Sequence, residues 1–270
     1  MKKSVTFILS ALLLGSCATN PFSGKSTLAL TPNSELFPMA FQQYDEFLQE
    51  NKRVTGTKDA KRVEDIGKKI KVAAETWLNA NGYSGYLKDY QWEYNLVQSD
   101  ELNAWCMPGG KIVFYTGILP VCKTDAGIAV VMGHEVAHAL ANHGQQRMSN
   151  ALLQQVGAVG VGILTQNSDP RAKQLWSAAY GIGSQVGYML PFSRSNESEA
   201  DKIGLTLMAI AGYNPEEAVS FWSRMAARNG GGSQSSFLST HPTNQDRIEE
   251  LRKLIPAAKA EAAKFGVSFK

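Results

Sequence analysis

The segment GIAVVMGHEVAHAL, residues 127–140, constrains the fold of this chain more than any other stretch. Its apolar character predicts a helix packed inside the protein, yet it contains His134, Glu135 and His138. Burying polar side chains that have no partner costs free energy, so polar residues on such a helix indicate a functional site in which they have partners. Residues four apart lie on one helix face, one turn apart, so both imidazoles can point at one ion.

The order His134-Glu135-x-x-His138 matches the arrangement in which two histidines bind zinc and the glutamate acts as a general base. Zinc lowers the pKa of its bound water to about 7, and Glu135 would take the proton when that water attacks a carbonyl carbon. His143 lies about 140° around a continuous helix from His138, which excludes it from the same ion. We interpret His143 as a structural residue or as one that supports a ligand.

A catalytic zinc ion takes three protein ligands and keeps one position open, so a third ligand is needed. The segment RSNESEADKIG, residues 194–204, offers Glu197, with Asp201 one helical turn later. We predict Glu197 as the ligand and Asp201 as the hydrogen-bond partner that orients a ligand histidine. Arg194, one turn earlier, is a candidate for the surroundings of the site, and Glu199 is the weaker ligand candidate. The alternative is a solvated acidic start of an ordinary helix.

The N-terminal sequence MKKSVTFILSALLLGSC is typical of a secretory signal peptide, because two lysines precede an apolar run too short to span a bilayer. Gly15 and Ser16 before Cys17 resemble the lipobox of bacterial lipoproteins, which implies cleavage before Cys17 and acylation of that cysteine. A plain signal peptide is the alternative. We therefore expect a lipoprotein signal peptide (1–16), a lipidated tether (17–33) and a single domain (34–270).

The residues after Cys17 bear on location, since they lack the aspartate that retains enterobacterial lipoproteins in the inner membrane. We therefore expect the protein in the cell envelope, anchored by lipid to the outer membrane and facing the periplasm, with lipid as its membrane contact. Without the signal peptide the chain is nearly neutral, so we expect no nucleic-acid partner. Whether Cys106 and Cys122 form a disulfide stays open.

Hydrophobic periodicity and turn residues predict one small sheet among many helices, an α+β class. Residues 91–99 alternate apolar and polar side chains like a strand, and 101–117 predict two strands around a Pro-Gly-Gly turn. The apolar stretch 151–164 is shorter than the roughly 20 residues that a membrane span needs, so we expect a core helix there. The predicted helices cover about 33–50, 57–79, 124–143, 146–164, 171–189, 195–211, 215–228 and 243–254.

Motifs in several parts of the chain resemble one known family. In chain order, NAWCMPGGKIVFYTGIL, SRSNESEAD and STHPTNQDRI look like the HtpX/CAAX-prenyl-protease family of the gluzincin class, in its soluble bacterial lipoprotein branch. The resemblance covers about residues 60–254. It implies a mainly helical zincin-like metalloprotease fold whose small sheet has an edge strand beside the active-site helix. Spanning helices like those of the integral-membrane members are not evident, so their prenyl-protein substrates are not carried over.

The resemblance also implies roles for named residues. His134, His138 and Glu197 would bind one catalytic Zn²⁺, with Glu135 as the base and Asp201 as the supporting carboxylate. The strand containing NAW would be an edge along which a substrate peptide lies.

Asn103 and Ala104 are the residues of that edge, and the physics agrees, because an extended peptide can add to a sheet edge by main-chain hydrogen bonds. Simple core packing is the alternative. His241 and Arg247 resemble the family's late His-Pro…Arg element, and we count both as catalytic candidates. His241 could stabilise an oxyanion, or it could be a fourth ligand that silences the enzyme, with the glycine-rich stretch 228–240 as a hinge. A residue without zinc contact is the third possibility.

The leading hypothesis is a lipid-anchored zinc endopeptidase that cleaves unfolded or misassembled envelope polypeptides, a substrate class that rests on the resemblance alone. A non-proteolytic zinc-containing envelope chaperone or assembly factor is the main alternative, with His241 as a permanent ligand. Glu135 argues against it, because a purely structural zinc site has no use for a base beside its ligand. A zinc hydrolase acting on non-peptide substrates is a weaker third hypothesis.

Overall fold

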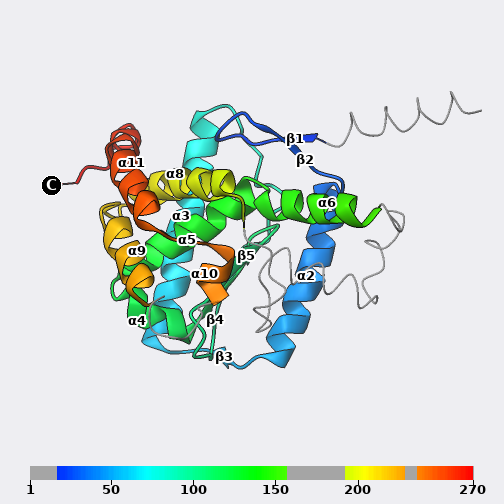
Figure 1. The fold of residues 1–270 in the computed structure, drawn as a ribbon, viewed down its shortest axis with the longest axis horizontal. Coiled ribbons are helices and arrows are strands. Elements are labelled where there is room, and N and C mark those ends of the chain that lie inside the picture. The colour runs from blue at the N-terminus through cyan, green and yellow to red at the C-terminus, as the bar shows by residue number, and fades with distance from the viewer. Residues whose placement is uncertain (1–16, 157–191, 229–235, 270) are drawn as a thin grey trace, which may run out of the picture.

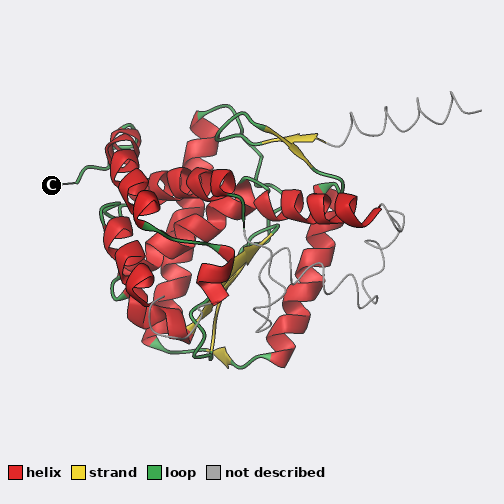
Figure 2. Ribbon diagram, in the orientation of Figure 1, coloured by secondary structure: helices red, strands yellow, loops and turns green. Residues whose placement is uncertain are grey.

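The computed structural model describes residues 17–156, 192–228 and 236–269, and the fold is the predicted mainly helical α+β class (Figure 2). The end of the predicted helix 146–164 and all of 171–189 lie outside these residues. The described helices are α2 (Asn33–Glu50), α3 (Lys58–Ala80), α4 (Leu119–Cys122), α5 (Asp125–Leu140), α6 (His143–Val156), α8 (Arg194–Ile210), α9 (Glu217–Arg228), α10 (Ser236–Thr240) and α11 (Gln245–Ala263), with a 3-10 turn at Thr116–Ile118.

The main sheet has four strands in the order β3-β4-β6-β5. Both outer pairs are antiparallel, and the central β4–β6 pair is parallel. The β5–β6 hairpin turns at Gly109 and Gly110, which have φ of 81° and 88°, a left-handed region that favours glycine. The predicted pair of strands around Pro-Gly-Gly is therefore confirmed, with β5 at a sheet edge. The strands are β3 (Arg53–Val54), β4 (Glu93–Val97), β5 (Ala104–Met107) and β6 (Lys111–Tyr115).

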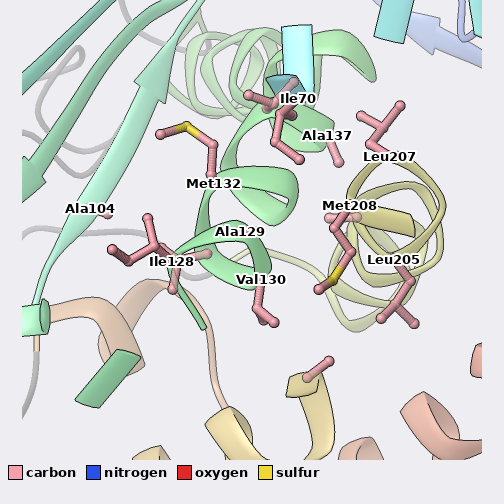
Figure 3. Packing of buried hydrophobic residues seen from close by; sticks show 14 of the residues in the cluster. Ile70, Ala104, Ile128, Ala129, Val130, Met132, Ala137, Leu205, Leu207 and Met208 are labelled. Atoms are coloured by element: carbon pink, nitrogen blue, oxygen red, sulfur yellow. The ribbon is translucent and has the colours of Figure 1, made fainter. Parts of the chain in front are cut away.

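Helix α5 lies at the centre of the molecule, between α3, α8 and the sheet (Figure 1). Nearly every residue of α5 is buried, as its apolar sequence predicts. Figure 3 shows side chains of α3, β5, α5 and α8 gathered in one core, among them Ile70, Ala104, Met132 and Met208. The polar residues of α5 are therefore surrounded by packed apolar elements.

The backbones of α5 and α8 touch where they cross. A Cβ atom at position 204 would lie 2.9 Å from the backbone nitrogen of His134, and one at position 133 would lie 2.8 Å from the carbonyl oxygen of Gly204. Only glycine allows so close an approach, because it has no Cβ. The crossing brings the start of α8 within reach of the histidines of α5.

Several helix ends differ from the prediction. Helix α5 ends at Leu140, three residues early, because Asn142 adopts a φ of 56° and α6 then begins at His143. Asparagine is among the few residues that tolerate this left-handed conformation. Helix α2 covers the predicted residues 33–50, and its N-cap, Pro32, has no side-chain hydrogen bond.

The C-terminal third also departs from the prediction. Residues 228–240 were expected to form a flexible loop, but Ser236–Thr240 forms the short helix α10; residues 229–235 lie outside the described part. Helix α11 continues to Ala263, past the predicted end at 254, and contains Pro256. Cys106 and Cys122 are buried free thiols.

The segment predicted as a tether contains a small hairpin of β1 (Cys17–Thr19) and β2 (Ser26–Leu28). Asn20 in its turn is fully buried, and the Phe22 ring stacks on Trp77 of α3 with centroids 4.3 Å apart. The predicted signal peptide, residues 1–16, lies outside the described residues. No single helix in the described ranges meets the length and hydropathy expected of a membrane span, although α5 does so jointly with the bent segment before it.

The glycine contact between α5 and α8 generates a stability prediction. We expect Gly204→Ala to lower the free energy of unfolding by about 1–3 kcal/mol, because the added methyl group meets rigid backbone. Urea denaturation measures this change. Lys202→Ala, on the exposed face of the same helix, is the control and should change stability by less than about 0.5 kcal/mol. Equal stability of the two variants would contradict the close packing described.

Candidate metal centre

Four buried side chains converge between α5, α8 and the residue that follows α10. They are His134, His138, Glu197 and His241; each is at most 5% exposed, and their ligand atoms lie within 4.8 Å of one another. Nε2 of His134 is 3.1 Å from Nε2 of His138 and 3.2 Å from Nδ1 of His241. Oε1 of Glu197 is 3.2 Å from Nε2 of His138 and 3.0 Å from Nδ1 of His241.

This donor set fits zinc. Metal–nitrogen distances of about 2.0–2.1 Å in a tetrahedral site place ligand atoms about 3.3 Å apart, close to the separations between these four groups. Zinc binds imidazole and carboxylate donors in this combination. The Nε2 atoms of His134 and His138 face each other, and a shared cation satisfies such buried lone pairs. The predicted grouping of His134, His138 and Glu197 is therefore present in the fold.

The predicted supporting carboxylate stands beside a histidine of this cluster. Oδ1 of Asp201 lies 3.0 Å from Nδ1 of His134, the nitrogen that faces away from the cluster. Burial alone would raise the pKa of Asp201, but the charge of Arg247 and the contact with His134 bring it below the ordinary value. Asp201 is therefore a carboxylate in the folded protein, able to accept the Nδ1 proton of His134.

Arg247 links both carboxylates of α8. Its guanidinium donates from Nε and Nη2 to the two oxygens of Asp201, each at 2.8 Å, and Nη1 lies 2.8 Å from Oε2 of Glu197. The guanidinium also stacks over Trp222, 3.7 Å from the ring centroid. Sequence analysis expected Arg247 to be catalytic; its contacts are those of a residue that fixes the carboxylates. Arg194 is exposed at the first residue of α8.

Glu135 lies beside the cluster and is almost fully buried. Burial raises the pKa of Glu135 to about 8, against the opposing charge of His134. A carboxylate with a raised pKa holds a proton better, which suits a group that accepts one from water near neutral pH. Its Oε1 lies 3.4 Å from Nε2 of His241.

His241 thus contacts both the cluster and the predicted base. Burial lowers the pKa of His241 to about 4, although Glu197 opposes the change, so its imidazole is neutral. A neutral imidazole offers one lone pair, which is what a metal ligand requires. The ring of Phe192 stacks on that of His138, with centroids 4.0 Å apart. The backbone N–H of Phe192 donates to the Thr240 carbonyl at 3.1 Å. These contacts close the site over the histidines.

The edge strand β5 borders a pocket beside the four clustered residues. Asn103 to Cys106 line it together with Glu135, His138 and His241. The Asn103 carbonyl accepts from the Tyr115 N–H, and paired residues alternate along an antiparallel ladder, so Ala104 and Cys106 direct their backbone groups away from β6. Oδ1 of Asn103 accepts from the Ala104 N–H at 3.0 Å.

His143 was predicted to be structural or to support a ligand, but its contacts were not predicted from the sequence. Because α5 ends at Leu140, His143 does not continue the same helix, so the argument from a continuous helix was wrong in its premise. Its Nδ1 lies 3.0 Å from Nδ1 of His138, and its Nε2 lies 3.0 Å from Oε2 of Glu199. Burial alone would raise the pKa of Glu199, but hydrogen bonds from His143 and Ser23 bring it to about 2. The left-handed tendency of Asn142 was the one available signal in the sequence.

The contacts of Arg247 generate a second stability prediction. We expect Arg247→Met to lower the free energy of unfolding by about 3–5 kcal/mol, because it leaves two buried carboxylates without their cation. Urea denaturation of this variant is compared with Arg252→Met, an exposed arginine of the same helix. A loss below about 1 kcal/mol, as for a surface ion pair, would contradict this role.

Comparison with known proteins agrees with this geometry. The model of peptidase family M48 matches residues 66–255. The mitochondrial metalloendopeptidase OMA1 of Schizosaccharomyces pombe is 36% identical over 183 residues, 65% of this chain and 50% of that protein. OMA1 of Saccharomyces cerevisiae is 34% identical over 207 residues, which are 73% of this chain and 56% of that protein. The beta-barrel assembly-enhancing protease of Escherichia coli O157:H7 is 30% identical over 162 residues, which are 58% of this chain and 33% of that protein.

The chain spans about half the length of the OMA1 relatives that it matches. The family match includes all four clustered residues and Arg247 at the start of α11. It confirms the metallopeptidase class that the sequence motifs predict. The chain therefore belongs to peptidase family M48.

Proposed function

We propose that the protein is a zinc metalloendopeptidase that hydrolyses unfolded or misassembled polypeptides of the bacterial cell envelope. The observation that carries the peptidase part is the buried cluster of three histidines and one glutamate with a second glutamate beside it. The envelope part rests on the predicted lipid on Cys17 and an outer-membrane location facing the periplasm. The name of one relative, the beta-barrel assembly-enhancing protease of Escherichia coli O157:H7, supports substrates of this kind.

His134, His138 and Glu197 would hold the metal ion, and Asp201 and Arg247 would hold two of these ligands in place. Zinc bound by these residues would supply Lewis-acid chemistry, which makes water a nucleophile at neutral pH and polarises a peptide carbonyl. Every other role in the proposal belongs to side chains and backbone of the chain.

Glu135 would act as the proton carrier. Its carboxylate accepts the proton of the attacking water and delivers it to the leaving amine nitrogen. Its burial favours this role, because the protonated form is stabilised between the two transfers.

The edge strand β5 would bind the substrate backbone. A peptide aligned along it gains main-chain hydrogen bonds from Ala104 and Cys106, independent of its side chains. Such binding needs an extended peptide, which an unfolded polypeptide supplies and a folded one does not. Oδ1 of Asn103 already accepts from the Ala104 N–H. The Ala104 N–H can bond to a substrate peptide only after this hydrogen bond breaks.

His241 would act as a reversible lock. Its Nδ1 is the fourth member of the ligand cluster, and its Nε2 approaches the base, so His241 occupies both positions in this arrangement. Displacement of His241 would expose both the fourth ligand position and Glu135. The competing role, in which His241 stabilises the oxyanion, requires the histidine to leave the cluster first.

The main alternative is a zinc-containing chaperone or assembly factor without proteolysis. The presence of His241 in the cluster favours it, since a fourth permanent ligand gives a closed structural zinc site. The buried base beside the ligands favours the peptidase. The next experiment separates the two.

Glu135→Gln removes the proton carrier but keeps the shape of the side chain. We expect cleavage of a quenched fluorescent peptide to fall by about 10²–10⁴-fold, the usual contribution of a general base, while bound zinc stays unchanged. Glu250→Gln, at an exposed position of α11, is the control. Full cleavage by Glu135→Gln would exclude the mechanism, and absence of cleavage by the parent would favour the chaperone.

His241→Ala tests the lock. A lock that keeps about nine-tenths of the molecules closed costs about 1.4 kcal/mol to open, so its removal should raise peptide cleavage about tenfold. Gln245→Ala, an exposed residue at the start of α11, serves as the comparison. Lost cleavage would instead assign His241 to the oxyanion, and unchanged cleavage would contradict both roles.

A further inference from the structure

A chain of hydrogen bonds runs outward from His138 to the N-terminal hairpin. His138 contacts His143 through their Nδ1 atoms at 3.0 Å, and His143 contacts Oε2 of Glu199 through Nε2 at 3.0 Å. The other carboxylate oxygen of Glu199 accepts from Nδ2 of Asn20 at 3.1 Å. These four residues come from α5, α6, α8 and the hairpin, which are separated along the sequence by up to 179 residues.

The direction of these hydrogen bonds follows from the groups themselves. A carboxylate only accepts, so Nε2 of His143 carries the proton that it shares with Glu199. The neutral ring then has its lone pair on Nδ1, which accepts the Nδ1 proton of His138. His138 is thereby left with its lone pair on Nε2, the nitrogen that lies 3.1 Å from His134 inside the cluster. One proton arrangement thus satisfies both contacts of His143.

The two histidines of α5 are supported in different ways. Nδ1 of His134 faces the carboxylate of Asp201 directly, at 3.0 Å. Nδ1 of His138 reaches a carboxylate only through the ring of His143. A partner on the outer nitrogen fixes the tautomer of a ligand histidine and raises its basicity.

We propose that His143 and Glu199 are positioning residues of the metal centre: they hold His138 in the tautomer and orientation that present its Nε2 to the ion, and Asn20 of the hairpin holds Glu199. This inference rests on the zinc site of the proposed function. It also gives the hairpin that begins at Cys17 a direct connection to the ligand set. Asn20 is fully buried, and its Oδ1 accepts from the Phe22 N–H at 2.9 Å, which fixes the amide toward Glu199.

Zinc affinity of the full-length protein, measured by competition with a chromogenic chelator, tests the inference. We expect His143→Ala to weaken zinc binding about 10–100-fold and to alter the visible absorption spectrum of the cobalt-substituted protein. His143→Asn places an oxygen near the position of Nδ1, so it should recover part of the affinity. Glu250→Ala, at an exposed glutamate, is the control.

Double variants distinguish positioning from a general packing role. Glu199→Ala and Asn20→Ala should each weaken zinc binding in the parent but add nothing in the His143→Ala background, because all act through one ring. Ser26→Ala, at an exposed hairpin residue, should leave affinity unchanged. If His143→Ala does not fold, His143→Asn and Glu199→Ala carry the comparison.

Two outcomes would overturn the inference, and they differ in what they leave standing. Parent-level zinc affinity and an unchanged cobalt spectrum in His143→Ala and Glu199→Ala, or losses that add in the double variant, would remove the positioning role while the zinc site stands. A parent protein that binds no zinc would overturn the inference together with the proposed function.

Discussion

The contact of Gly133 with Gly204 is the constraint on which the site depends. Where two helices meet backbone to backbone, the side chains that flank the contact can reach the other helix. Because of this contact, Glu197 and Asp201 reach the imidazoles of α5 without bending either helix. A larger residue at either position would separate α5 from α8 and divide the ligand set. Packing in the core therefore determines the chemistry that the site can perform (Figure 3).

The site gathers three buried acidic groups, and the charges of Arg147 and Arg247 both act on one of them, Glu135. Arg247 contacts Asp201 and Glu197, while Glu135 lies buried next to them. Buried charges are costly unless they are paired, so a bound cation should stabilise this fold by an amount that grows with its affinity. His241 contacts Glu197 and Glu135 and packs against Phe237. Closure of the site and stability of the fold are therefore linked through the same side chains.

The sequence predicts what depends on local periodicity and misses what depends on packing. Three features follow from spacing within a short segment: helix α3, the β5–β6 turn and the pair His134–His138. The clamp of Arg247 on Asp201 joins residues 46 apart, and no helical or strand period relates them. Predicting the contact of His143 would have required knowing that α5 ends at Leu140, three residues before it. The hairpin contact with Glu199 is longer-range still, so only the folded chain brings these groups together.

The central claim is that the buried cluster binds one catalytic zinc ion. Degradation of casein by the purified protein, before chelation, after chelation and after zinc is added back, tests it most directly, with zinc per chain measured at each step. We predict activity that disappears when zinc is removed and returns as one zinc per chain is restored. Casein degradation that continues with the cluster free of metal would contradict the account.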